Sequence, residues 1–473
     1  MGTSISVVIP VYNSAAYLRQ CLEHLKSSIR PPDEIIVVND GSTDGSEQVA
    51  TDGEAIVLRS GRRCGPARAR NLGAQRASGD VLFFIDADVL VRPDTVLRVE
   101  QAFEQDSELA ALIGSYDDDP EARDFLSQYR NLMHHFTHQQ ARREACTFWS
   151  GCGAIRRAAF LKHGGFDESY DRPAIEDIEL GYRLSRAGAK MTLDRDMQVK
   201  HLKRWTFWKL IKADILDRGI PWTELILRDR RMPNDLNVQL SQRVSVALVF
   251  LSCGLSLAAA IHWRGYFLTP LFAMLFLALG RFWCEHASRN EWRRGMIWAM
   301  VSLAALVVAA LAHDMPGLVP PLGIGCLLLT LHHRYEYAAP KRQRHTRWML
   351  IVVFCLVAAL SALYLPNHMV IFSLLVVIVA AMYLNSQFYL FLAGKRNRTF
   401  AAAAVPFHLL YHFYCGLSFV AGAVRYALRS PARANRPKPK PMAAEKGRAA
   451  AAGAGAAASG EAAPAPSGLF SRL

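Results

Sequence analysis

The chain has 473 residues, of which 51% are hydrophobic, and its formal net charge is +14. The basic residues cluster beside long apolar segments, an arrangement that favours contact with anionic lipid head groups over nucleic-acid binding. Nine cysteines are scattered without a CxxC pair, which excludes a disulfide framework and a cysteine zinc site and fits a reducing compartment.

The first 200 residues alternate short apolar runs with segments of helical periodicity. The runs that we expect to be strands lie at residues 4–10, 34–38, 54–58 and 80–85. Helices are expected at residues 15–28 and 66–77. This alternation predicts an α/β, doubly wound and mostly parallel sheet. The carboxyl ends of its strands should form a common edge at which a ligand binds.

Polar residues follow these strands at that edge. Tyr12 follows the first strand, Asp40 the second, and Asp86 and Asp88 the fourth. In an extended chain Asp86 and Asp88 point to the same side, and two such carboxylates suit Mg²⁺ or Mn²⁺, which can hold a diphosphate. A solvated loop is the alternative for this pair. Because neither G-x-G-x-x-G after the first strand nor a Walker A sequence occurs, nucleotide phosphates would need a divalent ion on Asp88 as their positive partner.

Several ordered motifs carry a resemblance to a known family. They are VVIPVYN at residues 7–13, VVNDGSTD at 37–44, ARARNLG at 67–73, the DxD at 86–88, FWSGCGAIR at 148–156, GGFDE at 164–168 and IEDIELGYRL at 175–184. Together they resemble family-two glycosyltransferases of the GT-A fold over residues 4–203. The resemblance implies a Rossmann-like GT-A catalytic domain that transfers a sugar with inversion from a nucleotide-sugar, by default a uridine nucleotide.

The resemblance also implies a set of binding residues. The nucleotide-sugar-binding residues would be Pro10, Tyr12, Asp40, Arg68, Asp86 and Asp88. Asp40 would hydrogen-bond the base or ribose with Tyr12 beside the base, Asp86 would hold the ribose or the metal, and Asp88 would hold the metal and diphosphate. Arg68 would lie near the nucleotide, but Arg70 could take that role, because spacing alone does not separate the two.

The acceptor side of the implied site is less tightly defined by the motifs. Asp177 is the candidate general base, because inversion needs a carboxylate opposite the leaving diphosphate. Together with Glu176 and Glu179 it opens a helix, where carboxylates are also favoured by the helix dipole alone. His201 resembles the histidine that completes the metal shell in some non-processive members, and a surface histidine among basic residues is the alternative.

The remaining candidates lie in an expected sugar and acceptor loop. These are Trp149, Gly151 and Cys152, with Glu176 beside them. Trp149 could stack on a sugar, although a core tryptophan is nearly as common. His134, His135 and His138 lie on a helical stretch that we interpret as an acceptor-side helix.

Six apolar segments indicate a transmembrane domain at residues 241–393. They lie at about 244–261, 266–282, 296–312, 318–331, 349–365 and 370–393. Links at 285–294, 332–347 and 394–399 are rich in Lys and Arg, whereas Arg264 is the only Lys or Arg in the alternate links. The positive-inside rule therefore predicts a multi-pass protein of the inner (cytoplasmic) membrane, with the catalytic domain at 1–203 in the cytoplasm.

Three further segments complete the predicted organisation. Residues 204–240 mix Trp with Arg and should form amphipathic interface helices at the head-group layer. Residues 394–430 are expected to form an interfacial or re-entrant helix, with a seventh crossing as the alternative. Residues 431–473 are rich in Ala, Pro and Lys/Arg and should be a disordered tail.

These features predict a membrane-bound, metal-dependent inverting glycosyltransferase that moves one sugar to a lipid-linked or polyprenyl-linked acceptor. A processive polysaccharide synthase with an export channel is the first alternative. Its Gln-x-x-Arg-Trp signature is missing, since neither Arg204-Trp205 nor Arg347-Trp348 has glutamine three residues before the arginine. A non-catalytic scaffold or lipid transporter is a second alternative, against which the intact acidic residues argue.

Overall fold

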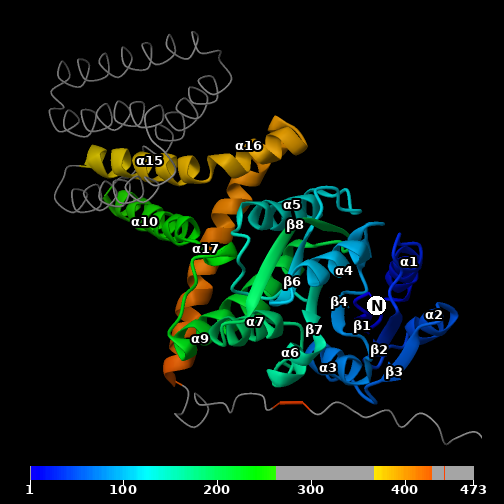
Figure 1. Cartoon of the computed structure of the whole chain (residues 1–473). Coiled ribbons are helices and arrows are strands. Elements are labelled where there is room, and N and C mark those ends of the chain that lie inside the picture. The colour runs from blue at the N-terminus through cyan, green and yellow to red at the C-terminus, as the bar shows by residue number, and fades with distance from the viewer. Residues whose placement is uncertain (1, 263–366, 429–440, 443–473) are drawn as a thin grey trace, which may run out of the picture.

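The computed structural model describes residues 2–262, 367–428, 441 and 442 (Figure 1). The strands are β1 (Ile5–Val11), β2 (Glu34–Asn39), β3 (Ile56–Arg59), β4 (Val81–Ile85), β5 (Val89–Val91), β6 (Leu109–Tyr116), β7 (Cys152–Arg156) and β8 (Lys190–His201). The helices of the N-terminal part are α1 (Ala15–Lys26), α2 (Ser46–Asp52), α3 (Pro66–Arg76), α4 (Thr95–Gln105), α5 (Phe125–Gln140), α6 (Arg157–Lys162) and α7 (Glu176–Arg186).

The later helices follow β8. They are α8 (Phe207–Lys212), the π-helix η1 (Ala213–Gly219), α9 (Ile220–Asp229), the 3-10 turn η2 (Leu236–Val238), α10 (Leu240–His262), α15 (Asn367–Leu384), α16 (Ser386–Lys395) and α17 (Arg398–Leu428). In Figure 1 these last four long helices gather on one side of the sheet domain, and α17 runs along it.

The described strands form one eight-stranded sheet in the order β3-β2-β1-β4-β7-β6-β8-β5. The first four strands in that order pair in parallel, which confirms the α/β alternation expected from the sequence. The rest of the sheet departs from a mostly parallel arrangement. Strand β7 is antiparallel to both of its neighbours and β5 is antiparallel to β8. The sheet is therefore mixed, because β7 enters between β4 and β6 from the opposite direction.

The parallel half of the sheet is buried on both faces. Val7 and Ile9 of β1 lie in one hydrophobic cluster with Leu18 of α1, whereas Val8 lies in another with Ala74 of α3. Successive strand residues point to opposite faces, so a strand covered on both sides is a continuous apolar run. This is why residues 5–9 lack the polar alternation of a half-exposed strand.

The segment after β8 forms the expected short helices. Trp222 of α9 donates a hydrogen bond to the Tyr182 hydroxyl of α7 at 3.0 Å, and both side chains lie in a small apolar cluster with Ile175. The segment 204–240 is therefore packed onto the sheet domain as well as amphipathic. Trp208 of α8 remains 76% exposed.

The apolar C-terminal half is described only in part. Two of the six expected spans fall on described helices: the first on α10 and the sixth on α15 and α16, which meet at a bend of 55°. Among the described residues, α17 is long and apolar enough to cross a membrane, and the bent pair would make a second such element. The other four expected spans, at 266–282, 296–312, 318–331 and 349–365, lie outside the described residues.

Helix α17 is continuous and contacts the sheet domain and interface helices over most of its length. Phe407 packs against Phe125 of α5, Tyr414 donates to Asp214 of η1, and Arg425 pairs with Glu224 of α9. A re-entrant break is therefore absent from residues 398–428.

The expected disordered tail falls outside the described residues except at its residues 441 and 442. The Met442 amide donates to the Leu161 carbonyl at 3.0 Å, and its side chain packs on the apolar cluster beneath α6. This part of the tail is bound to the sheet domain, because a methionine side chain fills an apolar gap there.

Candidate active site

The carboxyl ends of β1, β2 and β4 form one edge of the sheet. Val11 of β1 lies beside Asn39 of β2, and the Asp40 amide donates to the Val11 carbonyl at 2.9 Å. Asp86 directly follows β4, which pairs in parallel with β1. The residues that follow these strands therefore meet at one edge, as the sequence predicted.

Asp40 is buried and organises the loop before α3. Its Oδ1 atom accepts hydrogen bonds from the Ser60 hydroxyl at 3.0 Å and the Cys64 amide at 2.8 Å, and its Oδ2 atom accepts from the Gly65 amide at 2.9 Å. Gly65 adopts a φ of +88°, a conformation that favours glycine. One acceptor position remains on Oδ2, to which a nucleotide base could donate a hydrogen bond.

Tyr12 lies beside this loop with its ring partly open to solvent. It is 40% exposed, and the Arg63 guanidinium lies 4.1 Å from the ring centroid. One ring face is therefore covered by a cation, and a planar base could stack on the remaining surface. Pro10 lies two residues before Tyr12 in β1, is half-buried and pairs with Val38.

Arg70, rather than Arg68, lies among the acidic residues. Both lie on α3, but Arg68 is exposed and only approaches Glu168 at 3.9 Å. Arg70 is 4% exposed and its guanidinium bridges Asp86 at 2.6 Å and Glu176 at 3.0 Å. The two positions are on different faces of the helix, since residues two apart are not neighbours on a helix surface. Arg70 thereby links the DxD to the acidic start of α7.

Asp177 faces the same space from the N-terminus of α7. Its Oδ2 atom accepts from the Ser150 amide at 3.1 Å and the Ser150 hydroxyl at 3.2 Å. Its Oδ1 atom accepts from the Ile178 amide at 2.8 Å. Burial raises the pKa of Asp177 above its ordinary value. The carboxylate is held in one orientation and is a stronger base than a solvated aspartate.

His201 and Asp88 are brought together by the β5–β8 pairing. Val89 lies opposite His201 in that ladder, and the Leu202 amide donates to the Asp88 carbonyl at 2.9 Å. The His201 Nε2 and Asp88 Oδ2 atoms are 3.8 Å apart. His201 is buried and stacks on the Tyr116 ring at a centroid distance of 4.3 Å. Burial lowers its pKa to about 3, so the imidazole is neutral, the form that binds a metal ion.

The Asp88 and His201 side chains suit a divalent ion whose remaining coordination positions would be filled by the nucleotide diphosphate. Asp88 and His201 are close enough to share one ion and too far apart to hydrogen-bond. The Asp86 Oδ1 atom already accepts a hydrogen bond from Arg70. Within residues 2–262 and 367–428, no group of three or more His, Cys, Asp or Glu side chains is arranged for a metal ion. Oxygen atoms of a bound diphosphate would have to complete the coordination, as is usual for Mg²⁺.

The loop that contains Trp149, Gly151 and Cys152 is more deeply packed than expected. Cys152 is the first residue of β7, opposite Ile85, and is fully buried in the core. It therefore has no surface for a sugar or acceptor. Trp149 is half-buried against the rings of Tyr116 at 4.7 Å and His134 at 4.9 Å.

Gly151 leaves room for the Trp149 ring. A Cβ atom at residue 151 would lie 2.8 Å from Trp149 Cε2, so a larger residue there would displace the indole. Ser150, which lies between Trp149 and Gly151, contacts Asp177 and was not among the residues predicted from the sequence. Its position inside the FWSGCGAIR motif was the available signal.

The histidines of α5 also have structural roles. His135 and His138 place their Nδ1 atoms 2.7 Å from the Tyr116 carbonyl and 3.0 Å from the Gly114 carbonyl of β6. They attach α5 to the sheet. His134 instead packs against Tyr116 and Trp149, so α5 does contribute a ring to the surroundings of His201.

Comparison with known proteins finds similarity to glycosyltransferases. Residues 6–165 match the family model described as glycosyl transferase family 2. Glycosyltransferase GlyG of Streptococcus pneumoniae is 34% identical over 121 residues, which are 24% of this chain and 40% of that protein. Validoxylamine A glucosyltransferase of Streptomyces hygroscopicus subsp. limoneus is 31% identical over 228 residues, 41% of this chain and 50% of that protein.

A third relative extends further along the chain. Undecaprenyl-phosphate 4-deoxy-4-formamido-L-arabinose transferase of Pectobacterium carotovorum is 28% identical over 294 residues, 59% of this chain and 84% of that protein. The chain spans about half or less of the length of the two relatives above. The matched region contains the edge on which Tyr12, Asp40 and the DxD lie. Over residues 6–165 this chain is therefore similar to the transferases of glycosyl transferase family 2.

Proposed function

We propose that this protein is a membrane-bound, metal-dependent inverting glycosyltransferase that moves a single sugar from a nucleotide-sugar to a lipid-linked acceptor. The observation that carries the proposal is the Arg70 bridge between Asp86 and Glu176, at one edge of the sheet. It joins the DxD to the helix that presents Asp177, so that donor and acceptor chemistry share one site.

The donor side would be built from Tyr12, Asp40 and the DxD. Tyr12 would stack on the base, the Asp40 carboxylate would fix the base or ribose, and Asp86 with Arg70 would stand near the ribose. Asp88 and His201 would hold Mg²⁺ or Mn²⁺, which supplies Lewis-acid stabilisation of the leaving diphosphate. A uridine nucleotide is the default donor. Several relatives are named for transfer of a sugar, which supports donors of this class.

The acceptor side depends on Asp177. Its carboxylate would accept the proton of the attacking hydroxyl while the new bond to the anomeric carbon forms and the bond to the diphosphate oxygen breaks. Ser150 would orient the carboxylate through its two hydrogen bonds. Attack from the side opposite the leaving group inverts the anomeric configuration. Trp149, which is partly exposed, would offer an aromatic ring for contact with a sugar.

A lipid-linked acceptor is supported by two observations. The relative that matches over most of its length is named for undecaprenyl phosphate. Leu417, Val420, Val424 and Leu428 of α17 are all more than 40% exposed, and their spacing puts them along one stripe of the helix. An exposed apolar stripe of this kind indicates contact with a membrane.

The membrane arrangement is part of the proposal. The catalytic domain would lie in the cytoplasm against the inner membrane, with about six crossings in residues 241–393. The close packing of α17 on α5, η1 and α9 supports an interfacial position for this helix, because a crossing helix would leave the cytoplasmic domain.

The test is a panel of nucleotide-sugars offered to the purified protein in native lipid, with mass spectrometry of the products. We expect an acceptor lipid whose mass increases by one sugar, only when Mg²⁺ or Mn²⁺ is present. A polymeric product would contradict single addition and support a processive synthase. If the protein neither hydrolyses nor transfers sugar from any nucleotide-sugar in the panel, the enzymatic proposal is overturned.

A further inference from the structure

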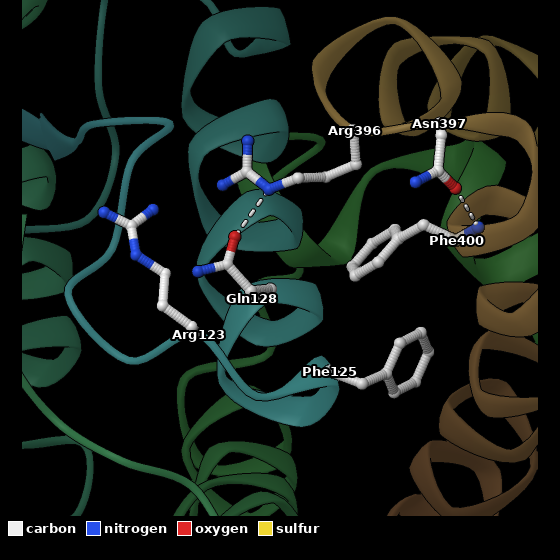
Figure 2. A pocket seen from close by; sticks show the side chains of 6 residues that line it. All are labelled: Arg123, Phe125, Gln128, Arg396, Asn397 and Phe400. Carbon is white, nitrogen blue, oxygen red and sulfur yellow. Dashed lines mark hydrogen bonds between the residues drawn. The ribbon is translucent and has the colours of Figure 1, made fainter.

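A pocket lies where the sheet domain meets the C-terminal helices. It has a volume of about 330 Å³, and its lining residues are Arg123, Phe125, Gln128, Arg396, Asn397 and Phe400 (Figure 2). Three of them come from α5 and the loop before it, two from the turn between α16 and α17, and Phe400 from the first turn of α17. Its volume is at the lower end of the range for small-molecule sites.

The polar part of the pocket is cationic. Arg396 reaches across the junction and donates to Gln128 Oε1 at 2.6 Å and to the Asp118 carbonyl at 2.9 Å (Figure 2). Both of these partners are neutral, and Arg396 makes no ion pair in the described part of the chain. A half-buried guanidinium without an anion is costly, because desolvation is not offset by an opposite charge. This charge is suited to an anionic ligand.

Arg123 and the start of α17 add to the positive potential. Arg123, in the loop before α5, pairs with Asp119 at 2.8 Å, and its side chain is 69% exposed. Asn397 accepts from the Phe400 amide at 2.8 Å and so caps α17. The N-terminus of this long helix carries partial positive charge. The nearby Asp118 is paired with Lys395 at 2.5 Å, so that carboxylate is already neutralised.

The other part of the pocket is apolar. The rings of Phe125 and Phe400 lie 4.9 Å apart, and Phe407 continues this wall about two turns further along α17. Leu390 on the adjoining α16 is 40% exposed. A cationic end next to an aromatic wall, at the first turn of an apolar helix, matches a phosphate carried on a hydrocarbon chain.

The pocket is separate from the proposed catalytic site. Helix α5 connects the two, with Phe125 at the pocket and His134 packed against Tyr116 and Trp149. Nine residues of helix separate these positions, about 14 Å at 1.5 Å per residue. A ligand in the pocket would therefore not be the reacting group.

We propose that this pocket binds the phosphate of a membrane lipid and thereby fixes the sheet domain to the membrane surface. The phosphate oxygens accept hydrogen bonds from Arg396 and Arg123, and the start of the lipid chain packs on Phe125 and Phe400. This assignment does not depend on which sugar is transferred, or on transfer at all.

The test measures binding of three soluble probes to the full chain in a non-ionic detergent. The probes are dioctanoyl phosphatidate, dioctanoylglycerol, which lacks the phosphate, and inorganic phosphate, which lacks the chain. We expect saturable binding of the phosphatidate and at least tenfold weaker binding of the other two. Equal binding of inorganic phosphate would overturn the lipid assignment, and equal binding of dioctanoylglycerol would overturn the role of the arginines.

Variants locate the binding site. Arg123→Gln should weaken phosphatidate binding about fivefold and Arg396→Gln about tenfold, because each removes a charge-assisted hydrogen bond. Arg98→Gln is the matched control, since Arg98 pairs with Asp94 four residues earlier, as Arg123 pairs with Asp119. It should bind within twofold of the wild type. Arg123 is exposed and paired only at the surface, so its variant should fold; unchanged binding by it and by Arg396→Gln would overturn the proposal.

Discussion

At the scale of single residues, the buried Arg70 is the centre of the site. It is 4% exposed, and its two partners come from segments far apart in the sequence, Asp86 after β4 and Glu176 at the start of α7. A buried arginine between two carboxylates is stable only while all three are present, because removal of one leaves an uncompensated charge. In the proposed site, the bridge would set the distance between the DxD and the helix that presents Asp177.

Arg70→Lys and Arg68→Lys form a matched pair of variants on one helix. A lysine at position 70 keeps the charge but cannot bridge two carboxylates with a planar fork, so we expect transfer to fall about a hundredfold. Arg68→Lys should change the rate less than about threefold, because Arg68 is exposed. Steady-state rates with one nucleotide-sugar decide between them, and the reverse order of effects would assign the nucleotide role to Arg68.

Asp177→Asn should abolish transfer while the nucleotide still binds. Asparagine is close in shape but cannot accept a proton, so a loss of about a thousandfold is expected. In the wild type, burial raises the pKa of Asp177, and the rate should fall as the pH drops through that pKa and the base becomes protonated. Nucleotide binding by calorimetry and a pH–rate profile check both statements. A near-normal rate in the variant would remove Asp177 from the role of base.

His201→Ala should raise the concentration of Mn²⁺ needed for half-maximal activity by about tenfold, because one of two close protein ligands is lost. Lys200→Ala is a neighbouring control, since Lys200 pairs with Asp119 and belongs to a different contact. A metal titration of the three proteins gives the comparison. Unchanged Mn²⁺ dependence in His201→Ala would exclude this histidine from the ligands.

At the scale of elements, the π-helix η1 holds the sheet domain and α17 together. Asp214 accepts from Arg130 of α5 at 2.6 Å and from the Tyr414 hydroxyl of α17 at 2.7 Å. All three side chains are buried. Gly219, at the end of η1, allows close approach of α17, since a Cβ atom there would lie 2.5 Å from Ser418 Cβ. The extra residue of a π-turn lets one short segment serve both neighbours.

Asp214→Asn should destabilise this junction by about 3 kcal/mol, because Arg130 would be left buried without a counter-charge. Asp217→Asn, in the same π-helix, is the control: its pair with Arg172 at 3.5 Å is partly exposed, and its loss should cost less than about 1 kcal/mol. Thermal unfolding and limited proteolysis between the sheet domain and α17 measure the difference. Equal stability of the two variants would show that the Asp214 contacts are not structural.

At the scale of the whole molecule, the position of α17 bears on the topology. Six crossings before residue 394 and an interfacial α17 would leave the C-terminus on the same side as the catalytic domain. A fluorescent protein fused after Leu473 should therefore be fluorescent in the cytoplasm, and an alkaline phosphatase fused there should be inactive. The opposite pair of results would make α17 a seventh crossing.

The sequence alone determined the chemistry-bearing parts of the protein. Residues 7–11, 35–38 and 81–85 are continuous apolar runs that end at Tyr12, Asn39 and Asp86, and this local pattern predicts a buried parallel sheet with a polar edge. The DxD and Asp40 were found in this way, whereas the acidic start of α7 was found through the resemblance to family-two glycosyltransferases. Such features are local, because they depend on residues close together in the chain.

Tertiary structure decided what depends on contacts between distant segments. The orientation of α3 against the sheet decides that Arg70, and not Arg68, contacts the carboxylates. The antiparallel insertion of β7 beside β4 decides that Cys152 is buried. The pairing of Asp88 with His201 likewise requires β5 to lie beside β8. Helix periodicity and strand propensity act over a few residues, whereas these positions result from packing between segments that can be more than a hundred residues apart.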